Sequence, residues 1–195
     1  MTEDLNTDGQ LMAQLQAGDP SVVEKISARY ANELRLFCQR MVYNEALAED
    51  IVQDVFMTCC KVDANTLPTG SLRGWLYRVT RNRAIDELRK RHPNVRLSAA
   101  STRDAVWADS ALPIDPVTTP AGKAVKADRA RRVKMVIDAM DDELREVVIL
   151  YFFQGLDREQ VAEAIGLTLS GTKARLAKAT RLLRDKLAGL NDSSL

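Results

Sequence analysis

The sequence predicts an all-α protein in which two small helical domains are joined by a flexible linker. Apolar residues recur at three- and four-residue steps on both sides of a central segment, and no useful stretch alternates as a strand would. That central segment holds four of the six prolines and is rich in alanine, serine and threonine. We therefore place the first domain at residues 1–92, the linker at 93–127 and the second domain at 128–195.

The first domain reads as helical from Asp8 onwards, with three amphipathic helices distinguished by their periodicity. The first has apolar residues at helical spacing from Val22 to Phe37, and Asp19-Pro20 is a plausible start because proline suits the first helical position. The second covers about residues 46–62. The third runs over about residues 72–91, after a loop, and ends before a proline.

The second domain contains the most informative stretch, residues 144–187. An apolar helical pattern is followed by a short amphipathic helix ending at Gly166, a turn at residues 167–169 and a strongly basic last helix. This is the layout of a helix-turn-helix, whose second helix enters a DNA major groove. The alternative, an amphipathic surface helix, leaves the turn and the preceding helix unexplained.

The last helix is expected to have a buried face and a DNA-binding face. Thr172, Leu176, Ala179 and Leu183 share one side by their spacing. Small residues on the opposite side allow the backbone to sit deep in the groove, where lysine and arginine reach phosphates and guanine edges. Thr168 is placed to cap the helix. The opposite side presents Ser170, Lys173, Ala174, Ala177, Lys178, Arg181 and Arg184.

The net charge of +1 conceals two basic islands. Residues 73–91 carry seven basic and two acidic side chains, and residues 168–190 carry six and one. Each island follows an acidic segment: residues 1–60 hold four basic and ten acidic side chains, and residues 138–163 hold two and eight. Two such islands favour two separate nucleic-acid contacts over two solvated helical faces.

The helix over residues 72–91 has a stripe that begins apolar and ends polar, formed by Trp75, Val79, Asn82 and Asp86. Asn82 and Asp86 are thus expected at core positions, where polar groups need partners. One interpretation is an internal cap that holds the neighbouring loop. The other is a pocket that reads an unstacked base by its hydrogen-bonding edge.

The helix over residues 46–62 leaves a mixed polar and methionine face exposed. This face carries Asp50, Gln53, Asp54, Met57 and Lys61. Such a surface suits a helical protein partner, although an ordinary solvated face gives the same pattern.

Three segments together resemble the bacterial group IV, or extracytoplasmic function (ECF), sigma factors of the sigma-70 family. They are AEDIVQDVF at residues 48–56, LRGWLYRVTRNRAIDELRKR at 72–91, and LREVVILYFFQGLDREQVAEAIGL followed by KARLAKATRLLRDKL. The resemblance covers nearly the whole chain except the linker. It implies that the first domain is sigma region 2 and the second sigma region 4, with a linker that threads toward the polymerase active site.

The resemblance implies a partner for each surface. Asp50, Gln53, Asp54 and Met57 match the segment that binds the β′ clamp helices of core RNA polymerase, and region 4 meets the β flap. The loop at residues 63–71 and the following helix match the part that melts the −10 element and captures a flipped base, with contacts expected from Trp75, Arg78, Arg81, Asn82, Asp86 and Arg89. The last helix matches the reader of the −35 element, with contacts expected from Ser170, Lys173, Ala174, Lys178 and Arg181.

The helix entry departs from the family pattern at two positions. Leu169-Ser170-Gly171-Thr172 stands where a valine-glycine-threonine-valine run is common. Gly171 lowers helix propensity by about 1 kcal/mol relative to alanine, and the Thr172 hydroxyl needs a partner. We therefore expect Gly171→Thr with Thr172→Val to stabilise the second domain by about 1–2 kcal/mol.

Other functional classes fit less well. An ordinary helix-turn-helix regulator, whose first domain binds a ligand or dimerises, leaves the second basic island unexplained. No catalytic constellation appears, since the single histidine precedes a proline at a helix end, and neither a metal nor a cofactor is expected. The three cysteines read as buried thiols of a reducing cytoplasm. The resemblance adds promoter DNA and a cognate anti-sigma factor, which can hold the protein at the inner membrane, as partners; no small-molecule substrate is expected.

Overall fold

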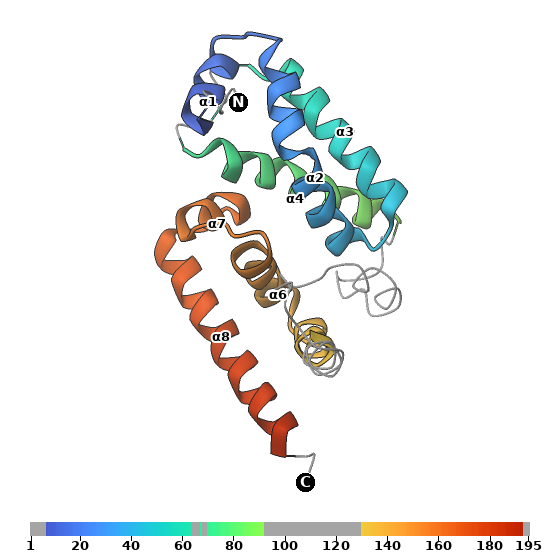
Figure 1. Ribbon diagram of the computed structural model, residues 1–195, viewed down its shortest axis with the longest axis vertical. Helices are drawn as coiled ribbons and strands as arrows, with labels where there is room; N and C mark the ends of the chain where they lie inside the picture. Colours follow the sequence, from blue (N-terminus) through green and yellow to red (C-terminus); the bar gives the residue numbers. More distant parts are fainter. Residues whose placement is uncertain (1–6, 64–66, 68–69, 92–129, 193–195) are drawn as a thin grey trace, which may run out of the picture.

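In the computed structural model, the described part of the chain comprises residues 7–63, 67, 70–91 and 130–192, and every regular element in it is a helix (Figure 1). This confirms the predicted all-α fold. None of the helices in these residues is both long and apolar enough to cross a membrane. The prediction of a flexible linker at residues 93–127 lies outside the described residues.

The first domain packs four helices around one core. They are α1 (Asp8–Gln16), α2 (Val22–Val42), α3 (Glu45–Lys61) and α4 (Leu72–Arg91). The long helix α2 contacts the other three, and its buried Phe37 meets the buried Tyr77 of α4. The rings of Phe37 and Tyr77 meet edge to face with centroids 5.0 Å apart.

Two helices in this domain begin at residues that apolar periodicity alone does not identify. A capping box between Thr7 and Gln10 begins α1, a helix that the apolar pattern alone did not separate from its neighbour. The proposed start at Asp19-Pro20 is displaced, because α2 begins at Val22 after a turn. Asp19 still caps that turn, since its Oδ1 accepts from the Ser21 amide at 2.9 Å.

The second domain follows with helical residues 130–138, α6 (Asp142–Val148), a π-helical turn η2 (Ile149–Phe153), α7 (Arg158–Ile165) and α8 (Leu169–Asp192). A capping box at Asp157 and Gln160 starts α7, and Gly166 ends it in the left-handed conformation at φ 71°. Because α8 already includes Leu169, the predicted turn at residues 167–169 is instead Gly166 to Thr168.

The two domains lie directly against each other. Helix α7 packs on α4, as Figure 1 shows, and the buried apolar residues of both domains form one contiguous cluster. The sequence predicted both domains but not this docking.

The cysteines divide into two environments. Cys38 and Cys59 are buried, and burial raises the pKa of both thiols to about 12. Cys60, which was expected to be buried, is exposed because successive residues of α3 point about 100° apart. The prediction of three buried thiols is therefore wrong at this position.

Candidate nucleic-acid and partner interfaces

Helix α8 presents the basic face that its sequence predicts. Thr172, Leu176 and Ala179 are buried, and Leu183 packs against the core. The exposed side carries every residue proposed to meet a −35 element: Ser170, Lys173, Ala174, Lys178 and Arg181. Two small residues among long basic side chains leave the helix backbone accessible, as a major-groove reader requires.

The start of α8 is fixed by Thr168. Its Oγ1 accepts a hydrogen bond from the Gly171 amide at 3.1 Å, which confirms the predicted cap. The Thr172 hydroxyl also has a partner, because Oγ1 donates to the Thr168 carbonyl oxygen at 3.1 Å. A β-carbon on Gly171 would lie 3.2 Å from Thr168 Oγ1 and crowd this cap. The partner that the Thr172 hydroxyl needs is thus the preceding turn of the chain, and the gain in stability expected from Gly171→Thr with Thr172→Val remains a prediction.

Thr168→Ala is expected to lower the free energy of unfolding of the second domain by about 1 kcal/mol. The substitution leaves an amide of the first turn of α8 without its acceptor. Urea unfolding of the full chain measures the change, and Thr180→Ala, which removes a hydroxyl bonded to the Leu176 carbonyl within α8, is the matched control. An equal loss of unfolding free energy in both variants would show that the Thr168 cap stabilises the domain no more than a hydrogen bond within α8 does.

Helix α4 offers a second basic surface, but its stripe is oriented differently from the expectation. Arg78, Asn82, Asp86 and Arg89 are exposed. Asn82 and Asp86 therefore do not occupy core positions, and the expectation that they do is wrong. The buried stripe is formed instead by Leu72, Leu76, Thr80 and Ala84, with the Thr80 hydroxyl bonded to the Leu76 carbonyl at 2.8 Å.

The remaining two residues proposed for the −10 element make contacts within the protein. Trp75 is only 7% exposed and lies in the core. Arg81 is half-buried in a forked ion pair with Glu146 of α6, where Nη2 and Oε2 lie 3.1 Å apart. The structure thus turns Arg81 toward the second domain.

Helix α3 presents the face proposed for a protein partner. Asp50, Gln53, Asp54 and Met57 are all exposed, and Met57, at 52%, is one of the most exposed large apolar side chains of the described residues. Ile51, Val55 and Cys59 are buried on the other side of the helix, as predicted. Within the residues that the structure describes, the main contacts of α3 are with α2 and α4 of its own domain.

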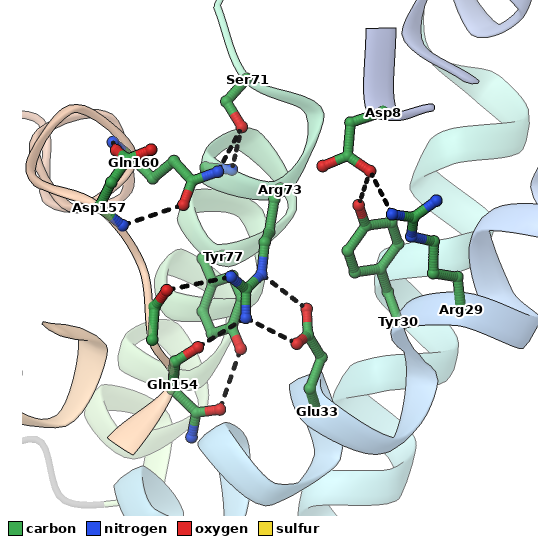
Figure 2. Close-up of polar contacts among 12 residues, drawn as sticks. Asp8, Arg29, Tyr30, Glu33, Ser71, Arg73, Tyr77, Gln154, Asp157 and Gln160 are labelled. Carbon is green, nitrogen blue, oxygen red and sulfur yellow. Dashed lines mark hydrogen bonds and ion pairs between the residues drawn. The ribbon is translucent and has the colours of Figure 1, made fainter. Parts of the chain in front are cut away.

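Arg73 joins the two domains, as Figure 2 shows. Its guanidinium holds Glu33 of α2 through two hydrogen bonds of 3.1 and 2.9 Å, and donates to the carbonyl oxygens of Gln154 and Gly155 at 2.6 and 3.3 Å. One turn later, the buried Tyr77 hydroxyl donates to Gln154 Oε1 at 3.0 Å. The π-helical turn places Gln154 for these contacts, and such turns are frequent at functional sites.

The first turn of α4 receives a carboxylate from α7. The Ser71 amide donates to Glu163 Oε2 at 3.0 Å, and Gln160 Nε2 donates to Ser71 Oγ at 3.2 Å. A β-carbon on Gly74 would lie 2.9 Å from Glu163 Oε2 and 3.3 Å from the Gln160 carbonyl oxygen. A side chain at Gly74 would require Glu163 or Gln160 to shift. The close approach also buries Glu163 enough to raise the pKa of its carboxyl group.

Sequence reasoning missed the residues of this contact, namely Ser71, Arg73, Tyr77, Gln154 and Glu163. Opposite charge on residues 73–91 and 138–163 was the available signal. Charge alone indicates nucleic-acid contacts and does not identify this contact between the domains. Within the described ranges no group of histidine, cysteine and acidic side chains is arranged to hold a metal ion.

Family comparison assigns both domains. Residues 26–93 match the family model for Sigma-70 region 2, and residues 130–183 match that for Sigma-70, region 4. The ECF RNA polymerase sigma factor SigK of Mycolicibacterium vanbaalenii is 30% identical over 147 residues, which cover 74% of this chain and 71% of that protein. SigW of Bacillus subtilis is 27% identical over 185 residues, covering 91% and 95%. The probable sigma factor RfaY of Xanthomonas campestris is 28% identical over 171 residues; this alignment covers 88% of the chain but 42% of RfaY.

Two solved structures share the fold. CnrH, in complex with the cytosolic domain of CnrY, matches with a TM-score of 0.58 and 22% identity over 97% of this chain and 100% of that one. The sigma factor RpoE of Bartonella quintana, in complex with the anti-sigma factor NepR, matches with a TM-score of 0.57 and 20% identity over 85% and 96%.

Proposed function

The chain belongs to the ECF RNA polymerase sigma factors of the sigma-70 family, and we propose that it carries out their task with three separate surfaces. It directs promoter-specific transcription initiation as a partner of core RNA polymerase and promoter DNA. The observation that carries the proposal is the presence of two exposed basic helical faces, on α4 and α8, in one chain. An ordinary helix-turn-helix regulator needs only the second.

The proposed −35 reader is the exposed face of α8. Lys173, Lys178 and Arg181 extend from a helix whose other side is anchored in the core. The capped first turn directs amide groups and a partial positive charge toward a backbone phosphate. The long side chains then supply phosphate and base contacts.

The proposed −10 surface is the exposed face of α4. Asn82 has a carbonyl oxygen and an amino group that can pair with the edge of an unstacked base. Arg78 and Arg89, both exposed, flank it with positive charge. The exposure of Asn82 favours base recognition over the internal cap that the sequence left open.

The proposed polymerase surface is the α3 face of Asp50, Gln53, Asp54 and Met57. Its negative charge and exposed methionine suit a helical partner that is basic and partly apolar. The β flap is proposed as the partner of region 4. We propose no catalytic role and no cofactor.

Regulation by an anti-sigma factor is also proposed, because two structural relatives are complexes with CnrY and NepR. A cytoplasmic location follows from the need to meet polymerase and DNA. An anti-sigma factor in the inner membrane would hold the protein at that surface.

Asn82→Ala is expected to impair promoter melting by about tenfold or more while leaving duplex binding by α8 unchanged, because a flipped base loses its hydrogen-bonding partner. Permanganate footprinting of the promoter complex with core polymerase measures the melted bases. Glu24→Ala, at an exposed position of α2 outside this surface, serves as the control. Normal melting by a folded Asn82→Ala protein would remove Asn82 from the −10 surface.

A further inference from the structure

We propose that α8 selects thymine at two neighbouring base pairs of the −35 element, through the methyl groups of Ala174 and Ala177. Both residues are exposed, and we call them the alanine pair. The proposal rests on the proposed role of α8 as the −35 reader and adds which bases it reads. Contact between duplex DNA and this helix is supported independently, because residues 130–183 match Sigma-70, region 4.

The alanine pair lies at the centre of the exposed face of α8. This helix is at the edge of the second domain, with α6 and α7 packed against one side of it (Figure 1). Successive residues point about 100° apart, so Ala174 is directed about 180° away from the midpoint between the buried Thr172 and Leu176. Ala177 follows about 4.5 Å further along the axis. Because base pairs rise by about 3.4 Å, a helix lying along the groove turns the two methyl groups toward neighbouring base pairs.

Basic side chains flank the alanine pair and leave it uncovered. Lys173 and Lys178 are exposed on opposite sides, each about 70° around the helix from the centre of the pair. They are therefore directed to the phosphates that border a major groove on its two strands. Arg175 follows Ala174 directly, but its Nη2 lies 2.9 Å from Glu143 Oε2 of α6, which holds this long side chain beside the domain. The two methyl groups thus remain open to the bases.

The chemistry of the alanine pair restricts the base pair that fits against it. Guanine and cytosine present hydrogen-bonding groups along the major-groove edge, namely guanine N7 and O6 and cytosine N4. Under two methyl groups these atoms lose water and gain no partner, which disfavours a G·C pair. Thymine presents a C5-methyl group on the same edge, and its contact with alanine removes apolar surface of both partners from water. An A·T pair is therefore favoured at each position.

The same two alanines also permit a different mode of recognition, in which small side chains let the helix backbone approach and DNA shape is read. The two modes differ in their dependence on one chemical group. Replacing thymine by deoxyuridine removes the C5-methyl group and keeps every hydrogen-bonding group of the base. Recognition through the methyl group predicts weaker binding after this replacement, whereas recognition of shape predicts nearly unchanged binding.

The test uses the complex of the full chain with core polymerase. Promoter duplexes are selected by this complex from a pool randomised over the −35 region, with the −10 region of a mapped promoter held constant. In an enriched duplex, each thymine of the −35 region is then replaced singly by deoxyuridine. At two neighbouring base pairs the replacement is expected to weaken binding by about fourfold, the factor for one buried methyl group, and at other thymines by less than about 1.5-fold.

Ala177→Gly removes the methyl group on the protein side. In this variant, deoxyuridine at one of the two base pairs is expected to weaken binding by less than about 1.5-fold, while the other base pair keeps its loss of about fourfold. Ala174→Gly is expected to give the reverse. Ala188→Gly is the matched control, since Ala188 is exposed on the same face three turns beyond Ala177 and the glycine lowers helix propensity equally. It is expected to leave both losses unchanged.

Two results would overturn the proposal while leaving the −35 role intact. One is binding that changes by less than about 1.5-fold for deoxyuridine at every thymine of the enriched element. The other is a loss that is the same in the two alanine-pair variants as in the unmodified chain. A failure of the proposed −35 role is seen separately, because no sequence is then enriched in the randomised region, and that result removes both the role and the choice of thymine.

Discussion

Lys178→Ala combined with Arg181→Ala is expected to weaken binding to a −35 duplex by about 2–4 kcal/mol, or roughly 30- to 1,000-fold at low salt. Both side chains are exposed on α8, opposite the buried Leu176 and Ala179. Two lost phosphate contacts are also expected to reduce the slope of log K against log salt by about 2. Fluorescence anisotropy over a salt series measures both quantities.

Lys25→Ala combined with Lys61→Ala is the matched control, because it removes two exposed positive charges from the first domain. It is expected to change duplex affinity by less than about threefold, since charges outside the contact act only through screened fields. If both double variants weaken binding equally, net charge rather than the α8 face determines affinity.

Asp54→Lys is expected to weaken binding to core polymerase by roughly 100-fold, because a like charge facing a complementary surface costs several kcal/mol. Asp54 is exposed on α3 between the buried Ile51 and Val55. The substitution therefore changes the surface without touching the core. Binding of the full chain to core polymerase, measured at two ionic strengths, gives the effect.

Glu24→Lys makes the same change in charge at an exposed position of α2 and is the control. It is expected to keep core binding within about threefold of the unmodified protein. Full affinity in a folded Asp54→Lys chain would move the polymerase contact away from α3.

The faces of α3 and α8 could be predicted from the sequence because each helix is buried along one side only. Apolar spacing then fixes the buried side, and the exposed side follows by rotation. The same reasoning gave the wrong buried side for the C-terminal half of helix α4. Its N-terminal half contacts both α2 and α7 and is buried on several sides, so that Trp75 is buried whereas Asn82, two turns later, is exposed.

The docking of the domains could not be read from periodicity, because it depends on single polar contacts. A π-helical turn positions Gln154, and no spacing of residues in the sequence predicts that turn. The absence of a side chain at Gly74 admits Glu163, yet the same glycine inside a helix pattern reads only as a weak position. The opposite charges of residues 73–91 and 138–163 can be read from the sequence. The sequence does not show that these two segments pair with each other.

Transcript mapping with purified core polymerase tests the central claim most directly. Core polymerase alone and core polymerase with this protein are each given the same genomic DNA, and the 5′ ends of the transcripts are sequenced. The account predicts new start sites, found only with the protein, that share one −35 and one −10 element at constant spacing. Start sites that are the same with and without the protein would contradict it.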